Sequence, residues 1–417
     1  MLRKVLVEVC RVLLGVVFIF SGLVKSIDPV GGAIKIGEYL DSFHLPHTAT
    51  TDLYLSMGLS GFEFILGAFI LMGIYRRISS KLIFAVMCFM TLLTLYLALF
   101  NPVSDCGCFG DAVKLTNWET FAKNLILLPA SYYYMKYPRL CAHLFSSRGR
   151  WLPGIIAVCG IVYFMVGNYM HLPIKDFRPY KVGADLRALT HIPPGAPTDE
   201  YEHTFVYKKE GEQKEFDMND LPDSSWSFVE RRDKLIKKGY TPPINDFALF
   251  DDEGENIADT ILADSKGVIM LMAPHWSGAD QSKIAQISEV YNYAEAHGYR
   301  FYGVSGSSDR DMSQWKYQTG ADYPMLFMDA TTVKTVVRGN PGLVLLKDGK
   351  IIDKINFYDF PAVNDVPTFF KQEFEEMNPH DRHKSSAILL YIWSGLVLIG
   401  LIRRIIRENR IAFKKNK

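Results

Sequence analysis

The sequence predicts a multi-pass α-helical membrane bundle of about six helices, joined to a soluble α/β domain. The runs Leu82 to Ser104, Trp151 to Met170 and Ser385 to Ile402 contain no charged residue. Each run has about the 20 residues that a helix needs to cross a bilayer. The stretch 172–384 holds 25 Lys and Arg against 35 Asp and Glu, whereas the rest holds 21 against 10. The formal net charge is only +1, so composition gives no sign of a nucleic-acid partner.

Three further apolar runs contain charged residues and are also predicted to span the membrane, which gives six spans in all. They are Val5 to Val24, Leu53 to Tyr75 and Trp118 to Met135. Glu8 and Arg11 lie three residues apart on one helical face and are expected to pair, whereas Glu63 has no local partner. Met1 to Ser21 is also compatible with a signal peptide. We expect a retained first helix, because no small-x-small cleavage site follows before Lys25.

The basic residues between the predicted spans set the orientation. With the N-terminus inside, 16 Lys and Arg lie in the inner segments and 3 in the two short outer loops. Basic residues in short loops are retained on the cytoplasmic side. Both termini are therefore predicted inside, with loops 25–52 and 105–117 and the acidic stretch 172–384 outside.

The predicted spans and the acidic stretch divide the chain into six segments. These are a four-helix membrane domain (1–140), a fifth helix (151–171), an extended and β-rich segment (172–243), an α/β domain (244–378), a sixth helix (385–403) and a basic tail (404–417). His203 to Lys209 and Gln213 to Phe216 flank a Gly-containing turn and predict a β-hairpin. Thr241-Pro242-Pro243 is the expected linker.

Residues 244–378 alternate between strand and helix patterns. The expected order is a strand at 267–272, a helix at 281–297, strands at 300–304 and 324–328, a hairpin at 342–357 and a closing helix at 366–377, with short helices at 311–318 and 331–337. This order is typical of an α/β domain.

That order and its spacing resemble the thioredoxin fold. Where a thioredoxin carries Trp-Cys-x-x-Cys, this chain has Trp276, then Ser277 and Asp280 at the two cysteine positions. Pro341 matches the cis-proline of that family. The domain has no cysteine, so it cannot perform thiol-disulfide exchange itself. The resemblance implies a groove that binds an extended polypeptide or a small ligand; the alternative is a packed aromatic and a loop histidine. The candidate groove residues are His275, Trp276, Ser277, Asp280 and Pro341.

Of the six cysteines, only Cys106 and Cys108 lie together on the predicted outer, oxidising face. Gly107 between them permits a tight turn that brings the sulfurs together. The strained ring that would result is typical of exchangeable disulfides. A static staple, a free thiol pair and a zinc site with His44 and His47 are the alternatives.

Residues 1–140 resemble the DoxX/MauE family of small membrane proteins. The resemblance rests on Phe18-Ile19-Phe20-Ser21-Gly22-Leu23-Val24-Lys25, on Glu63, and on Asp105-Cys106-Gly107-Cys108-Phe109-Gly110 followed by Trp118-Glu119. It implies a bacterial inner-membrane protein with its large domain in the periplasm and a role in redox chemistry or protein maturation. MauE-like members are linked to methylamine utilisation.

Two functions remain open on this sequence. In the first, Cys106 and Cys108 exchange electrons with a periplasmic protein partner, Glu63 handles a proton, and a quinone is the candidate cofactor. In the second, the chain is a non-enzymatic assembly protein whose soluble domain binds a partner and Glu63 is a structural acid. A transporter is less well supported, because no inverted repeat or interrupted helix is evident.

Overall fold

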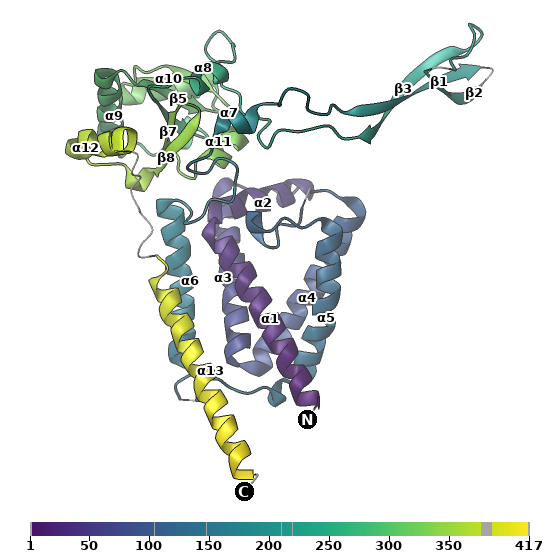
Figure 1. Cartoon of the computed structure of the whole chain (residues 1–417), viewed down its shortest axis with the longest axis vertical. Coiled ribbons are helices and arrows are strands. Elements are labelled where there is room, and N and C mark those ends of the chain that lie inside the picture. The colour runs from purple at the N-terminus through teal and green to yellow at the C-terminus, as the bar shows by residue number, and fades with distance from the viewer. Residues whose placement is uncertain are drawn as a thin grey trace.

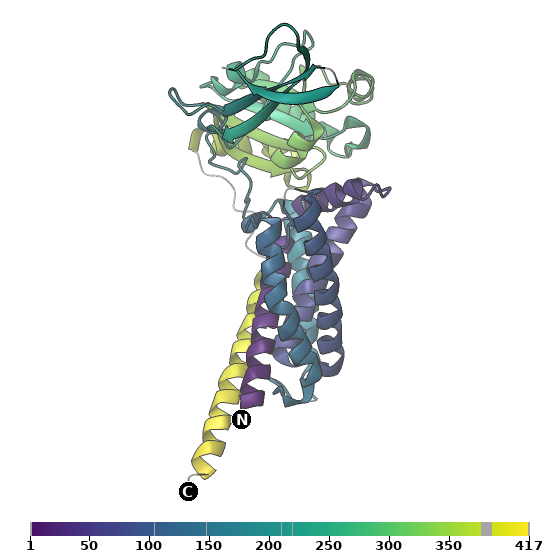
Figure 2. The ribbon, with the colours of Figure 1, turned by 90° about the vertical axis from the view of Figure 1, so that its right-hand side faces the viewer.

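The computed structural model describes residues 2–103, 105–146, 148–209, 211–218, 220–376 and 386–415, with side chains up to residue 406. A helical bundle forms one half of the molecule, and an α/β part lies against one end of it (Figures 1 and 2). A three-stranded arm extends sideways from the α/β part. Helix α1 begins, and helix α13 ends, at the opposite end of the bundle.

Six long helices form the bundle. They are α1 (Leu2–Ile27), α3 (Ala49–Met72), α4 (Arg76–Phe100), α5 (Asn117–Lys136), α6 (Trp151–His171) and α13 (Ile388–Lys415). All except α5 are long and apolar enough to cross a membrane, which confirms five of the six predicted spans. Helix α5 has 20 residues and packs beside α4, but it is less apolar, so its crossing stays a prediction. Helix α13 starts at Ile388 and continues helically through the predicted tail.

The end of the bundle next to the α/β part has more structure than the sequence predicted. Loop 25–52 contains a helix, α2 (Pro29–Ser42), which lies across the bundle below the α/β part (Figure 1). The Asp28 side chain accepts a hydrogen bond from Gly31 N, and Pro29 occupies the first helical position. Both features favour a helix start. Two short 3-10 helices, η1 (Gly110–Ala112) and η2 (Pro138–Leu140), lie on either side of α5 along the chain.

Helices α1 and α3 approach closely because glycine faces the partner backbone on both. A Cβ added at Gly22 would lie 2.6 Å from Ser60 O, and one added at Gly67 would lie 2.6 Å from Ile19 N. Real Cβ atoms essentially never approach another atom this closely, so each site requires glycine. The close approach places the end of α1 directly against the middle of α3.

The α/β part is built on a five-stranded sheet in the order β6-β5-β4-β7-β8. Strands β4, β5 and β6 are parallel, whereas β7 is antiparallel to both β4 and β8. The strands are β4 (Val268–Ala273), β5 (Arg300–Ser305), β6 (Met325–Phe327), β7 (Gly342–Lys347) and β8 (Lys350–Asn356). The helices are α7 (Leu186–Thr190), α8 (Ala258–Leu262), η3 (Trp276–Gly278), α9 (Ile284–His297), α10 (Asp309–Thr319), α11 (Ala330–Val336), η4 (Phe357–Asp359), η5 (Val363–Asp365), α12 (Val366–Lys371) and a π-helical turn (Gln372–Glu376).

Alternate residues of the central strand β4 face two apolar cores. Met270 and Met272 pack into one, and Ile269 and Leu271 pack into the other. Every β4 residue is buried, as expected for a strand covered on both faces. The first core also includes Tyr180 and Leu186, which precede the arm in the sequence. The arm is therefore inserted between two stretches that pack in the same core.

The arm is an antiparallel sheet in the order β2-β1-β3. Its strands are β1 (Glu200–Lys209), β2 (Glu212–Asp217) and β3 (Ser227–Lys237). The predicted hairpin corresponds to β1 and β2, and β3 was not predicted. All 11 residues of β3 are exposed.

Candidate functional site

The loop between α4 and α5 holds the two outer cysteines at the end of the bundle that faces the α/β part. Gly107 has φ +60°, the left-handed conformation that glycine adopts without strain. Gly107 N donates a hydrogen bond to Asp105 Oδ1, and the Tyr39 hydroxyl donates one to Cys106 O. The Cys106 and Cys108 sulfurs lie 2.7 Å apart and are free thiols. They are close enough that oxidation to a disulfide, with its bond of about 2.05 Å, needs only a small movement.

The two thiols differ in acidity. The hydrogen bond from Cys106, aided by the charges of Lys123 and Lys25, lowers the pKa of Cys108 to about 6 despite burial. The same hydrogen bond, together with burial, raises the pKa of Cys106. At neutral pH the pair therefore carries one proton, on Cys106, and the thiolate is Cys108. The thiolate is the reactive form of cysteine.

Glu63 has partners, contrary to the expectation of an isolated acid. The Lys25 ammonium lies 2.7 Å from its carboxylate, and Ser21 Oγ lies 2.8 Å from Glu63 Oε2. Ser21 Oγ is also 2.6 Å from Cys108 O. Ser21 and Lys25 were named only as part of the family resemblance, and their contacts with Glu63 were missed because the residues are separate in sequence. The close packing of α1 on α3 brings them together. The expected pairing of Glu8 with Arg11 is confirmed at 2.7 Å.

Cys106, Cys108 and Glu63 line one cavity of about 360 Å³ at this end of the bundle. Most of its other walls are apolar, including Phe18 and Leu127. Its charged lining comes from Lys25, Asp28, Lys35, Asp111 and Lys123. The structure thus brings all three predicted membrane-site residues to one partly open cavity. Of the charged lining, Lys123 also lies 4.4 Å above the ring of Phe109, beside the cysteines.

The predicted groove residues of the α/β part also lie together. The Asn340–Pro341 peptide bond is cis, as expected. Asp280 N donates to Asn340 O, and Asn340 Nδ2 donates to His275 O. Trp276 is buried and stacked on Trp315 at 4.5 Å, so its ring is a packed aromatic of the core.

The polar members of this group face solvent. His275, Ser277 and Asp280 are exposed. Their role in binding stays a prediction. Within the described residues no group of three His, Cys, Asp or Glu side chains could hold a metal ion. His47 instead lies between Asp41 and Asp52, at 2.9 and 2.8 Å.

Comparison with protein families gives two matches. Residues 3–135 match the model of methylamine utilisation protein MauE, so this part of the chain is a MauE-like membrane segment. Residues 201–238, which form most of the arm, match a domain of unknown function (DUF8463). No curated protein matches the chain. The MauE match and the apolar helices identify a multi-pass membrane protein.

Proposed function

We propose that the chain is a bacterial inner-membrane thiol oxidoreductase that oxidises cysteines of a periplasmic protein through Cys106 and Cys108. One observation carries the proposal: the two thiols line the same apolar cavity as Glu63 and Lys25. A disulfide that only stabilised the loop would require neither a cavity beside it nor buried charges, which are costly in a bilayer. The match of residues 3–135 to a family named for methylamine utilisation is consistent with the maturation role that the DoxX/MauE resemblance implies.

The difference in thiol acidity defines the order of the exchange. The cycle starts from the Cys106–Cys108 disulfide, and a partner thiolate attacks Cys106 and forms a mixed disulfide. Cys108 leaves as the thiolate, because the nearby charges of Lys123 and Lys25 favour its ionised form and make it the better leaving group. A second partner thiolate then releases Cys106, so the partner gains a disulfide and the pair becomes a dithiol. Two electrons and two protons must leave before the next cycle.

The cavity fits a quinone as the acceptor of those electrons. Its apolar walls suit a prenylated ring, and Lys25, Lys123 and Ser21 are donors for carbonyl oxygens. A bound quinone would accept two electrons and two protons. Among the chain's own residues, Glu63 would accept these protons, because its carboxylate lines the same cavity as the two thiols.

The α/β part is proposed to be a thioredoxin-like domain that binds the partner without performing exchange. Support comes from the parallel β4 and β5, the antiparallel hairpin β7 and β8, and the cis peptide before Pro341 next to the loop at Trp276. Ser277 and Asp280 at the two cysteine positions are consistent with a binding role alone.

The experiment is reduction of a soluble ubiquinone analogue by a dithiol peptide, catalysed by the purified full chain. Wild type should reduce the quinone, whereas Cys106→Ser and Cys108→Ser should fall to the uncatalysed rate. Cys159→Ser is the matched control, because Cys159 lies in α6 outside the cavity lining. Quinone reduction by Cys108→Ser at the wild-type rate would overturn the proposal.

Glu63→Gln refines the same assay. The substitution removes the charge but keeps the shape of the side chain. If Glu63 handles a proton, Glu63→Gln should reduce the quinone more slowly than wild type. If Glu63 is only structural, the rate should be unchanged.

A second function, partner assembly without catalysis, is favoured by the arm. Its strand β3 is an exposed edge whose 11 residues have no covering element in the described chain. Such edges add strands from other chains. In this case removal of residues 199–240 would abolish partner binding, and both cysteine variants would retain full function.

A further inference from the structure

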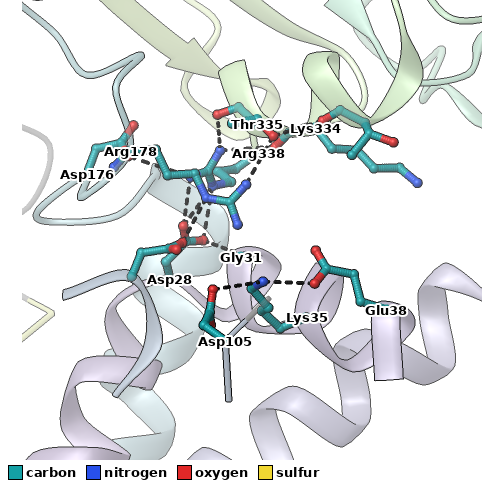
Figure 3. A network of polar contacts seen from close by, with 12 residues as sticks. Asp28, Gly31, Lys35, Glu38, Asp105, Asp176, Arg178, Lys334, Thr335 and Arg338 are labelled. Atoms are coloured by element: carbon teal, nitrogen blue, oxygen red, sulfur yellow. Dashed lines mark hydrogen bonds and ion pairs between the residues drawn. The ribbon is translucent and has the colours of Figure 1, made fainter. Parts of the chain in front are cut away.

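The α/β part holds two acidic residues of the cavity wall by direct ionic contacts. Figure 3 shows Arg338 above Asp28, with Arg178 beside it. Arg338 Nη2 lies 2.7 Å from Asp28 Oδ2, and Arg338 Nε lies 3.0 Å from Asp28 Oδ1. Arg178 Nε lies 2.9 Å from Asp111 Oδ2. Asp28 follows α1, and Asp111 lies three residues after Cys108. The α/β part therefore contacts the cavity wall both at the end of α1 and beside the cysteine loop.

The Arg338–Asp28 contact is buried and the Arg178–Asp111 contact is partly buried, which makes them unlike an ordinary surface ion pair. The Arg338 side chain is 1% exposed; its Nη1 donates to Lys334 O and Thr335 O, and its Nη2 also lies 3.6 Å from Asp176 Oδ1. Burial disfavours the charge on Asp28, but Arg338 and the other partners outweigh it and lower the pKa of the carboxyl. Breaking a buried pair by removing one partner leaves an uncompensated charge and is costly.

The contacts also connect the two candidate sites. Arg178 donates to Thr335 Oγ1, and Arg338 lies three residues before Pro341. Phe177, next to Arg178, is part of the cavity wall. A short chain of contacts thus runs from the cysteine loop through Asp111 and Arg178 to the segment that carries the cis-proline.

We propose that Arg338 and Arg178 are positioning residues that clamp the α/β part over the thiol cavity and close its outer mouth. They act through Asp28 and Asp111, and they control how readily a reagent or partner reaches Cys106 and Cys108. That this control matters for thiol exchange rests on the proposed function. The closure of the cavity by the two arginine contacts does not depend on it. Opening the two arginine contacts exposes the thiols.

The experiment measures how fast a membrane-impermeant maleimide labels Cys106 and Cys108 in the full chain. The other four cysteines are replaced by alanine, and the pair is reduced beforehand. Arg338→Met, Asp28→Asn and Arg178→Met should each label about tenfold faster than wild type or more, because loss of a buried pair shifts an equilibrium by at least that factor. Arg338→Lys should give an intermediate rate, since it keeps the charge but loses the two-pronged contact.

The control is Arg187→Met, which removes an exposed arginine from its contact with Asp348 elsewhere in the same part of the chain. It should label at the wild-type rate. The double variant Asp28→Asn with Arg338→Met should label more slowly than the product of the two single effects predicts, because both variants remove the Asp28–Arg338 contact. A general loss of structure would instead give additive increases.

Labelling of Arg338→Met, Asp28→Asn and Arg178→Met at the wild-type rate would overturn the proposal. If Arg338→Met fails to accumulate, Asp28→Asn tests the same contact from the bundle side. Labelling does not depend on electron transfer, so this result is independent of whether the pair exchanges electrons.

Discussion

At the scale of single residues, the cysteine pair is asymmetric although its sequence is nearly symmetric. Cys106 and Cys108 flank one glycine, yet the surrounding bundle supplies positive charge mainly to Cys108. Lys25 comes from α1 and Lys123 from α5. The asymmetry therefore depends on the assembled bundle and cannot arise in an isolated loop peptide.

We predict that alkylation of the reduced pair in the full chain rises with pH around a midpoint of about 6. The pKa of Cys108 is lowered, so its reactive thiolate is present above that pH and is lost as the pH falls through it. A free cysteine would show a midpoint at about 8.5. Alkylation rates measured between pH 4 and pH 10 check this; Cys106→Ala, which removes the hydrogen bond, should move the midpoint upward. An unchanged midpoint in Cys106→Ala would contradict the assigned cause.

The sequence identified the candidate reactive residues of the cavity, but it did not identify the residues that contact them. Cys106, Cys108 and Glu63 stood out because thiols on an oxidising face and acids in apolar spans are rare. Ser21 and Lys25 did not, because a serine and a flanking lysine are ordinary at the end of a membrane helix. Their importance comes from the distance between α1 and α3, which a single sequence does not encode in any local pattern.

At the scale of elements, glycine contacts hold the site together. Gly22 lies between Ser21 and Lys25 along the chain, and its hydrogen faces the backbone of α3. Any side chain there must separate the two helices, which would move Lys25 and Ser21 away from Glu63. Helix packing and the geometry of the cavity are therefore coupled.

We predict that Gly22→Ala destabilises the bundle by about 1–3 kcal/mol, the usual cost of overpacking a tight contact. Thermal denaturation of the detergent-solubilised chain measures it. Gly58→Ala is the matched control, because a Cβ at Gly58 in α3 meets no atom within 4 Å. That variant should be neutral or slightly stabilising, since alanine favours helix over glycine. Equal melting temperatures for the two variants would show that the α1–α3 contact is looser than described.

The elements that sequence reasoning missed had weaker signals than those it found. The strands of the α/β core are apolar runs bounded by turns and were located closely, as β4 and β7 illustrate. Helix α2 is short and only partly buried, although Asp28 before Pro29 was a recognisable start signal. Strand β3 is exposed throughout, so no alternation of apolar and polar burial marked it.

At the scale of the whole molecule, the α/β part and the cysteine loop lie at the same end of the bundle (Figure 1). Asn356 Nδ2 at the end of β8 donates to Tyr169 O in α6, and His171 Nδ1 lies 2.7 Å from Asp359 Oδ1. Together with the Arg338 contact, these bonds hold the α/β part against the bundle. Pro341 lies three residues after Arg338, so a partner held at Pro341 would be close to the bundle.

We predict that Thr116→Cys and Ser224→Cys, in a chain without its native cysteines, react with an impermeant maleimide added outside. Ser146→Cys should not react until the membrane is permeabilised. All three positions are exposed, so burial cannot explain a failure to label. The pair at 116 and 146 lies on either side of α5, so it decides whether this more polar helix crosses the membrane. Labelling of both from outside would show that α5 does not cross.

The central claim is that Cys106 and Cys108 alternate between disulfide and dithiol while the protein works. The most direct measurement is their redox state in intact membranes, trapped with an alkylating reagent and read by mass, with respiration running and with respiration blocked. We predict an oxidised pair during respiration and accumulation of the dithiol when respiration is blocked, because reoxidation then stops. A pair that stays fully oxidised, or fully reduced, in both conditions would contradict the account.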